Sequence, residues 1–188
     1  MIGFDRSYFE ALYQEDIDPW KFRVSEYEHL KFAKTIAALP GLRFEKCLEL
    51  GCSIGELTRR LLSRCNRIVA IDTSVLALEE ARSACPTPRV EFRQTHLPDG
   101  DLGSGYDLVI ASEILYYLDA VALRRLACRL RKIVPRGAYI VSVHWTEPTN
   151  YPLTADIATQ LCFEEAKIEC QRTDIFPKFR LDVGRFSA

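Results

Sequence analysis

Apolar and polar positions follow a regular order from Lys46 onward. Short apolar runs rich in Val, Ile and Leu are separated by stretches of helical period, which is the pattern of a parallel sheet covered by helices. We therefore predict an α/β fold with strands at residues 47–50, 67–71, 90–92, 106–111 and 138–143. Two further apolar stretches, at 167–170 and 180–183, are predicted to pair as an antiparallel hairpin at the sheet edge.

Helix signals lie between these runs. A helix is predicted through Leu57 and Leu61, and the run 72–74 (Asp-Thr-Ser) offers an N-cap for the next helix. A third amphipathic stretch, 123–133, stops before Pro135. The predicted order is therefore strand and helix in alternation.

The first 44 residues precede the first core strand and are not needed to close the sheet. Ser25 is a predicted N-cap for a helix that runs to Leu39. This segment is either an outer helix that shields one face of the sheet or a lid across a ligand crevice. We expect one domain over residues 1–188, with 1–44 as an N-terminal helical lid and 45–188 as the ligand-binding core.

The candidate chemistry lies where the first two strands end. The first strand leads into Glu49-Leu-Gly51, a second glycine follows at Gly55, and Asp72 ends the next strand. Gly51 permits a tight reversal, and Gly55 lets a ligand or a strand approach the helix closely. A carboxylate in the place of Asp72 can accept hydrogen bonds from ribose hydroxyls. A nucleoside-bearing ligand is therefore predicted here.

Two cofactor classes suit this geometry. A dinucleotide needs the middle glycine of G-x-G-x-x-G to admit its pyrophosphate, whereas the spacing here is G-x-x-x-G. S-adenosylmethionine has no pyrophosphate, and its ammonium group calls for an acid such as Glu49. We favour the methyl donor, and a nicotinamide-dependent oxidoreductase stays as the alternative.

Further motifs support a family resemblance. Glu49-Leu-Gly-Cys-Ser-Ile-Gly, Asp72, the run 106–113 (YDLVIASE) and the run 130–137 (LRKIVPRG) look like the ordered motifs of class I S-adenosylmethionine-dependent methyltransferases. The runs 18–20 (DPW), 25–28 (SEYE), 51–55 (GCSIG), 112–117 (SEILYY) and 143–145 (VHW) resemble the NodS-like nodulation N-methyltransferases, from about residue 8 to the C-terminus. The resemblance implies a three-layer Rossmann-like fold with a mostly parallel sheet and an antiparallel C-terminal edge strand.

The resemblance also implies roles for single residues. Glu49, Gly51 and Gly55 would line the methionine part of the donor, Asp72 would hold the ribose, and Ser112 would sit at the carboxyl edge beside the methyl group. Many class I members carry an acid near the adenine, where this chain has Thr95 and His96. The full set expected at the cofactor is Trp20, Tyr27, Glu49, Gly51, Cys52, Gly55, Asp72, Thr73, Thr95, His96 and Ser112.

Candidates for catalysis follow from the needs of an amine acceptor, which must be neutral when it attacks. Glu113, His144 and the hydroxyl of Tyr116 or Tyr117 are the candidate proton acceptors, with Glu113 first for orienting the acceptor. His144 can equally be a satisfied histidine at a strand end, and the tyrosines can be packing residues. The family resemblance implies a de-N-acetylated chito-oligosaccharide as acceptor, with Trp20, Tyr117 and Trp145 suited to sugar rings. Another small amine or hydroxyl, or donor binding without turnover, stays open.

Composition and charge limit the partners, metal sites and cellular location that we expect. The formal net charge of −1 argues against a nucleic-acid partner, and no apolar run is long enough for a membrane span. The seven cysteines are scattered without a C-x-x-C pair, so we predict buried thiols and no metal site. We expect a cytoplasmic protein, monomeric or weakly dimeric, that acts on a small molecule or an oligosaccharide.

Overall fold

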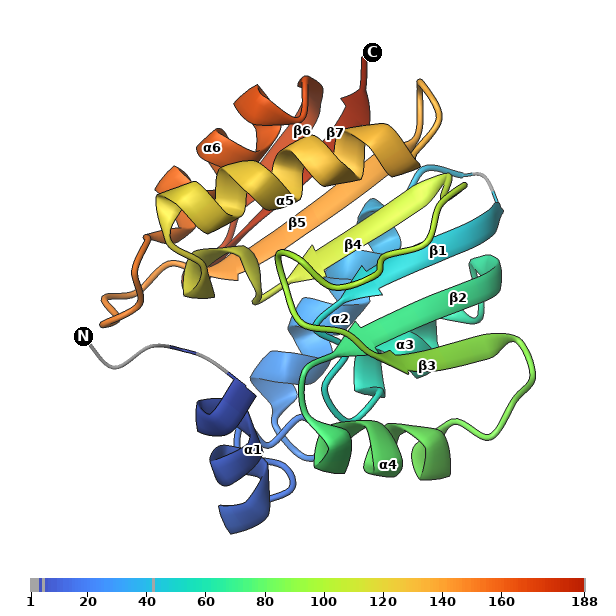
Figure 1. Cartoon of the computed structure of the whole chain (residues 1–188), viewed down its shortest axis with the longest axis vertical. Helices are drawn as coiled ribbons and strands as arrows, with labels where there is room; N and C mark the ends of the chain where they lie inside the picture. The colour runs from blue at the N-terminus through green and yellow to red at the C-terminus, as the bar shows by residue number, and fades with distance from the viewer. Residues whose placement is uncertain (1–3, 5, 42, 188) are drawn as a thin grey trace. The chain divides into compact units, whose positions relative to one another are not determined.

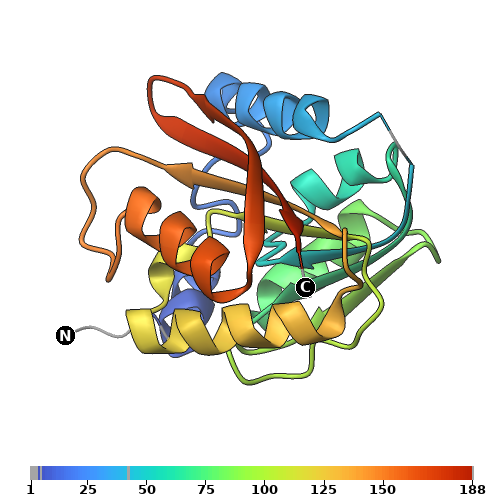
Figure 2. The same cartoon turned by 90° about the horizontal axis from the view of Figure 1, so that it is seen from above.

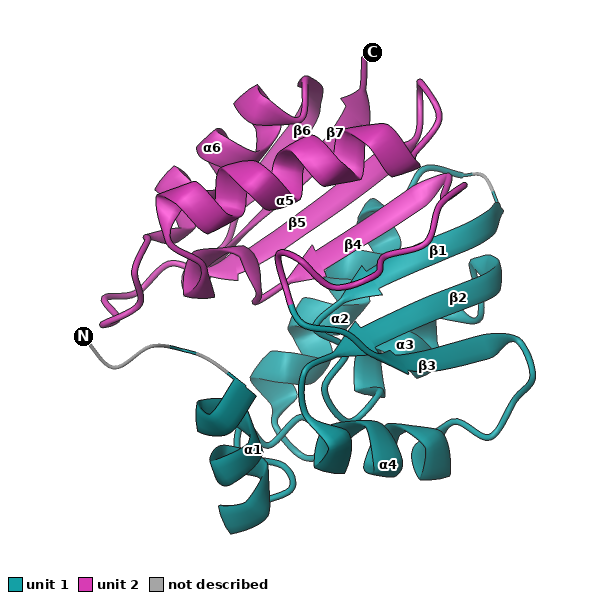
Figure 3. Cartoon of the chain, in the orientation of Figure 1, with its two compact units in different colours: residues 1–96 teal, residues 97–188 magenta. Residues whose placement is uncertain are grey.

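The computed structural model describes residue 4, residues 6–41 and residues 43–187. The chain divides into two compact units, residues 1–96 and residues 97–188, which Figure 3 shows in different colours. The prediction of a single domain with a lid at 1–44 stays a prediction. None of the helices in the described part of the chain has the length and apolarity that crossing a membrane requires.

Unit 1 is built on three parallel strands. Strand β1 pairs with β2, and β2 pairs with β3, all in parallel (Figure 1). Its elements in chain order are α1 (Arg6–Glu15), α2 (Glu26–Ala38), β1 (Phe44–Leu50), α3 (Glu56–Leu61), β2 (Cys65–Asp72), α4 (Val75–Ala84) and β3 (Val90–Gln94). The last four residues of β1 and the last five of β2 are buried, as expected of parallel strands that helices cover.

Two helix starts in unit 1 confirm the capping predictions. The Ser25 hydroxyl accepts a hydrogen bond from the Glu28 N–H at the start of α2. The Ser74 hydroxyl does the same for the Ala77 N–H at the start of α4. Each bond satisfies an amide that the first turn of a helix leaves without a partner in the helix.

Unit 2 has four strands with mixed pairing. Strand β4 pairs in parallel with β5, and β7 pairs antiparallel with both β5 and β6. Its elements are β4 (Leu108–Ser112), the 3₁₀ helix η1 (Leu115–Tyr117), α5 (Ala120–Ile133), β5 (Tyr139–Trp145), α6 (Ala155–Glu165), β6 (Ile168–Ile175) and β7 (Phe179–Phe186). Helices α5 and α6 lie side by side (Figures 1 and 2).

The predicted fold class is confirmed, including mostly parallel pairing and the antiparallel C-terminal hairpin. Two helices, α1 and α6, were not predicted as such. The buried face of α6 consists of Ala155, Ala158, Thr159, Cys162 and Phe163. These residues have helical spacing, but four of the five are small, so the hydrophobic pattern of α6 is faint.

Candidate functional site

A glycine turn joins β1 to α3. Gly51, Ser53 and Gly55 all have left-handed backbone conformations, with φ of 69°, 50° and 81°. The Cys52 N–H donates to the Ile71 carbonyl of β2 at 2.9 Å, which fixes the turn to the end of the neighbouring strand. The predicted reversal therefore forms, with a non-glycine residue in its middle held in a conformation that side chains disfavour.

Gly55 serves close packing between two helices. A Cβ atom on Gly55 would lie 3.1 Å from the Cβ and 3.3 Å from the Cα of Ala81 in α4. The neighbour that approaches this glycine is thus a helix and not the predicted strand, and the predicted approach of a ligand stays a prediction.

Asp72 ends β2, as predicted, and its carboxylate is buried. One oxygen accepts the Ser53 N–H at 2.8 Å, and the other accepts the Ser74 N–H at 3.0 Å. Burial raises the pKa of Asp72, and these backbone donors partly oppose the rise. Asp72 thus joins the glycine turn to the start of α4.

Glu49 is the second buried carboxyl group of this region, with a relative exposure of 2%. The Thr58 hydroxyl of α3 donates to it at 2.6 Å. Burial raises the pKa of Glu49 to about 8; the Thr58 hydrogen bond opposes this rise, and the negative charge of Asp72 adds to it. A positively charged ligand group beside Glu49 would lower this pKa, so the site fits the ammonium of an amino acid.

Cys52 and the residues predicted near an adenine also lie in unit 1. Burial raises the pKa of the Cys52 thiol, so it is protonated and packs as a small apolar group. The Thr73 hydroxyl and His96 Nδ1 are 2.9 Å apart on the surface. Thr95 is buried, and its N–H donates to the Asp72 carbonyl. Thr73, Thr95 and His96 therefore gather at the carboxyl ends of β2 and β3.

The N-terminal segment packs directly on the glycine turn. The Tyr13 hydroxyl of α1 donates to the Ser53 hydroxyl at 2.5 Å. Tyr13 is also buried with Ile54 and Ala77, and Trp20 packs against this cluster. The contact between Tyr13 and Ser53 was not predicted, since 40 residues separate the two in the sequence.

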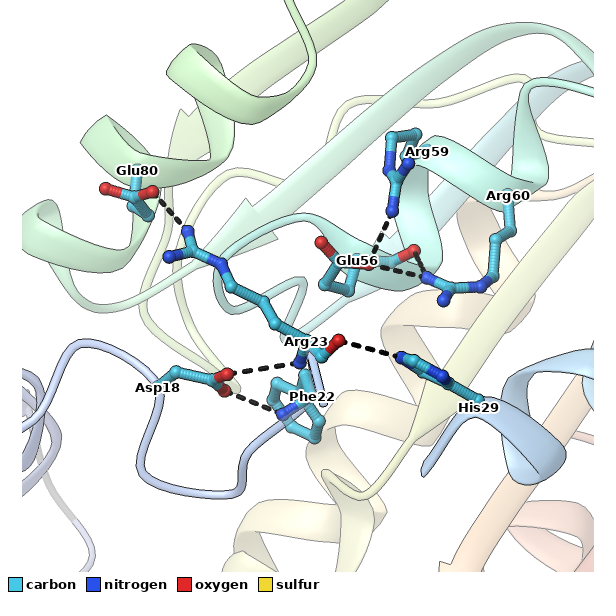
Figure 4. A network of polar contacts seen from close by, with 8 residues as sticks. All are labelled: Asp18, Phe22, Arg23, His29, Glu56, Arg59, Arg60 and Glu80. Carbon is cyan, nitrogen blue, oxygen red and sulfur yellow. Dashed lines mark hydrogen bonds and ion pairs between the residues drawn. The ribbon is translucent and has the colours of Figure 1, made fainter. Parts of the chain in front are cut away.

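Polar contacts fix the following loop (Figure 4). The buried Asp18 carboxylate accepts the N–H groups of Phe22 at 2.8 Å and Arg23 at 3.1 Å. The Arg23 guanidinium forms an ion pair with Glu80 of α4, and the Arg23 carbonyl lies 3.1 Å from His29 Nε2. Asp18 of the 18–20 motif thus shapes a loop that leads Trp20 onto the cluster. Tyr27 lies in α2, with the Lys31 ammonium 5.2 Å from its ring centre.

In unit 2 the chain turns sharply after β4. Glu113, next to Ser112 at the end of the strand, has a left-handed φ of 55° and donates its N–H to the Val143 carbonyl at 2.7 Å. One carboxylate oxygen of Glu113 accepts both the Tyr116 hydroxyl and the Trp145 N–H, the latter at 2.9 Å. Strained backbone conformations of this kind cluster at functional sites.

Three tyrosines pack together beside Glu113. The ring centres of Tyr117 and Tyr151 lie 4.5 Å apart, those of Tyr116 and Tyr151 4.8 Å, and those of Tyr116 and Tyr117 5.0 Å. The Tyr117 hydroxyl donates to that of Tyr151 at 3.3 Å. Burial, together with the charge of Glu113, raises the pKa of Tyr116 far above its usual range, so its phenol is protonated. Tyr151, in the loop after β5, was not predicted.

His144 lies on β5 and is fully buried. Its Nε2 accepts the Leu115 N–H at 3.1 Å, and its Nδ1 lies 3.1 Å from the Ser142 hydroxyl. The catalytic candidates therefore belong to one unit: Glu113 follows β4, Tyr117 lies in η1, and His144 lies on β5, which pairs with β4.

The sequence and the fold of this chain are similar to those of known proteins. The sequence model of the family nodulation protein S (NodS) matches residues 10–138. The chain belongs to the NodS family. The resemblance predicted from short motifs is thereby confirmed, although the run 143–145 lies outside the matched range.

Individual NodS relatives show the extent of the likeness. A nodulation protein S from Rhizobium tropici is 25% identical over 165 residues, which are 82% of this chain and 69% of that protein. One from Azorhizobium caulinodans is 28% identical over 102 residues, and the match spans about half of each chain, 54% of this one and 49% of that protein.

Solved structures share the fold. A Pseudomonas syringae protein described as a methyltransferase is 31% identical, with a TM-score of 0.75 over 86% of this chain and 99% of its own. The N-methyltransferase NodS from Bradyrhizobium japonicum WM9, in complex with S-adenosyl-L-homocysteine, is 17% identical, with a TM-score of 0.84 over 95% of this chain and 98% of its own.

Proposed function

We propose that this NodS family member is an S-adenosylmethionine-dependent methyltransferase that methylates the free amino group of a de-N-acetylated chito-oligosaccharide. The observation that carries the donor assignment is the buried Glu49 carboxyl, whose pKa is raised to about 8 beside the glycine turn. A positively charged ligand group beside this carboxyl would stabilise its ionised form and pair with it.

The residues of unit 1 divide the work of holding the donor. Glu49 would pair with the ammonium of the methionine part, and Asp72 would accept hydrogen bonds from the ribose hydroxyls. Gly51 leaves room beside the turn, and Thr73, Thr95 and His96 would lie on the adenine side. The bound donor would supply a methyl group already activated by a positively charged sulfur. The protein itself has to align the acceptor and exclude water.

Tyr13→Phe tests whether the turn depends on the N-terminal segment. Loss of the Tyr13 hydroxyl removes the hydrogen bond that the buried Ser53 hydroxyl accepts. We expect donor affinity to fall about threefold to tenfold and the free energy of unfolding to fall by about 1 kcal/mol. Calorimetric titration and thermal denaturation measure these changes. Tyr8→Phe, in the same helix, is the matched control; an equal loss there would contradict the assignment.

The residues of unit 2 would handle the acceptor. An amine bound as its ammonium must lose a proton before its lone pair can attack, and the Glu113 carboxylate can orient the amine and take that proton, directly or through water. The Tyr117 hydroxyl would accept or donate a further hydrogen bond. Both ring nitrogens of His144 have partners within unit 2, so we assign proton transfer to Glu113.

Several features support an aminosugar acceptor. Tyr117, Tyr151 and Trp145 are partly exposed aromatic residues near Glu113, and such rings stack on sugar faces. The relatives are named nodulation protein S, and the solved NodS is named an N-methyltransferase.

Five buried free thiols suit the cytoplasmic setting that we propose for the reaction, since a reducing compartment preserves them.

A second acceptor class has one specific observation in its favour. The family match ends at residue 138, before Trp145 and Tyr151. Residues that would contact the acceptor therefore lie outside the matched range, and a different small amine or hydroxyl would leave the donor half of the proposal intact.

Transfer of a labelled methyl group tests the proposal. The panel contains partly de-N-acetylated chito-oligosaccharides, their fully acetylated forms as matched controls, glucosamine and unrelated small amines. We expect label on the de-N-acetylated chains alone, at the nitrogen, and release of S-adenosylhomocysteine. Label on another amine would overturn the substrate, whereas donor binding without transfer to any acceptor would overturn the enzyme assignment.

A further inference from the structure

A chain of buried hydrogen bonds runs through unit 2 from α6 to the turn after β4. The hydroxyls of Thr159 and Ser142 lie 3.4 Å apart, and the Ser142 hydroxyl lies 3.1 Å from His144 Nδ1. His144 Nε2 then accepts the Leu115 N–H at 3.1 Å. Ser142 and His144 have no exposed surface, and Thr159 is 3% exposed.

The last bond determines the protonation state of His144. A backbone N–H can only donate, so Nε2 must be the acceptor and carries no proton. The proton of the neutral ring is then on Nδ1, which donates it to the Ser142 hydroxyl. A second proton would have to enter at Nε2, where it would face the Leu115 N–H and break that bond.

The turn that His144 holds is the one that carries Glu113. Val143 accepts the Glu113 N–H, and Trp145 donates its N–H to the Glu113 carboxylate. His144 lies between these two residues and accepts the N–H of Leu115, the first residue of η1. Val143 and Trp145 thus contact Glu113 itself, and His144 between them contacts η1, which carries Tyr116 and Tyr117.

We propose that His144 is a positioning residue: as a neutral imidazole, it holds η1 and thereby keeps Glu113 and the tyrosines in the conformation that the acceptor requires. The inference rests on the proposed function, because Glu113 is taken as the group that contacts the acceptor. It replaces the interpretation of His144 as a base. It also gives a reason for a fully buried histidine two residues from an exposed loop.

The protonation state can be tested without any acceptor. In the whole protein labelled with ¹⁵N, two-bond correlations to the ring protons distinguish the two nitrogens of each histidine. We expect His144 at neutral pH as the Nδ1–H form, with Nε2 unprotonated. The exposed His29 is the control. A protonated Nε2, or a doubly protonated ring, would overturn the proposal even if the acceptor of the enzyme were still unknown.

Two variants test the positioning role. The amide introduced by His144→Gln can offer an oxygen to the Leu115 N–H, whereas His144→Phe fills the space without an acceptor. We expect His144→Phe to lower turnover about tenfold or more and raise KM for the acceptor, with donor Kd within about twofold of wild type. His144→Gln should recover turnover to within about threefold of wild type, with an unchanged pH–rate profile.

If His144 acted as a base, we would expect a different pattern of kinetic effects. Both variants would then lose turnover alike, their pH–rate profiles would lose a limb, and added imidazole would restore activity to His144→Ala. Either that pattern or a changed donor Kd in a folded His144→Phe would overturn the positioning role. If His144→Phe does not fold, the pH–rate profile of His144→Gln and the ¹⁵N measurement still distinguish a positioning residue from a base. His29→Gln is the matched control and is expected to behave as wild type.

Discussion

Donor affinity is expected to be highest near pH 8 and to fall about tenfold for each pH unit below it. The reason is that burial keeps Glu49 protonated below about pH 8, whereas pairing with the donor ammonium requires the carboxylate. Binding must therefore release a proton at pH 6 to 7. Above pH 8 affinity falls again, because an α-amino group with a pKa of about 8 loses its charge.

Calorimetric titration of the donor between pH 6 and 9, in buffers of different ionisation enthalpy, measures both affinity and proton release. Glu49→Gln should weaken binding near pH 8 and remove the dependence on pH below it. Glu56→Gln is the matched control, since the two neighbouring arginines hold the pKa of Glu56 low against its partial burial. An unchanged slope in Glu49→Gln would show that another group titrates.

The same pKa makes the free protein less stable as pH rises. The folded pKa of about 8 exceeds the ordinary value of 4.5, so between these limits the folded state binds more protons than the unfolded state. Stability contributed by Glu49 is complete below pH 4.5 and is lost through pH 8, by up to about 5 kcal/mol. The raised pKa of Asp72 acts in the same direction. Denaturation curves should therefore show that Glu49→Gln flattens the pH dependence of wild type.

The region around the glycine turn, where we propose that the donor binds, was predictable because its determinants are local in sequence. A tight reversal calls for Gly51, a strand end places Asp72, and serine N-caps announce α2 and α4. Each signal lies within a few residues of the structure that it specifies. Parallel pairing then brings the ends of consecutive strands together without further information.

The remaining contacts depend on pairs that are distant in sequence. The Tyr13 hydroxyl meets Ser53 only because α1 packs on the glycine turn, and His144 meets Leu115 only because β5 pairs with β4. The sequence around Tyr13 does not indicate that Ser53 is its partner, and the sequence around His144 does not indicate Leu115. Glu113 was predicted as a functional residue, but its strained backbone and its two donors depend on Val143, Tyr116 and Trp145.

Glu113→Gln is expected to lower turnover by about a hundredfold or more while donor Kd stays within about twofold of wild type. The substitution is informative because one oxygen of Glu113 accepts both the Tyr116 hydroxyl and the Trp145 N–H. The amide oxygen of the variant can take over both bonds, and its NH₂ group replaces the other oxygen. The fold of the turn is retained, and the negative charge is lost.

The comparison with neighbouring variants then separates charge from geometry. Tyr116→Phe removes one donor to Glu113 and keeps the carboxylate, so its loss of turnover should be smaller, about threefold to tenfold. Glu147→Gln, at an exposed residue of the loop after β5, is the matched control and should leave turnover unchanged. Single-turnover rates at saturating donor measure all three. If Glu113→Gln retains wild-type rates, no carboxylate is needed at this position, and the acceptor amine must bind in its neutral form.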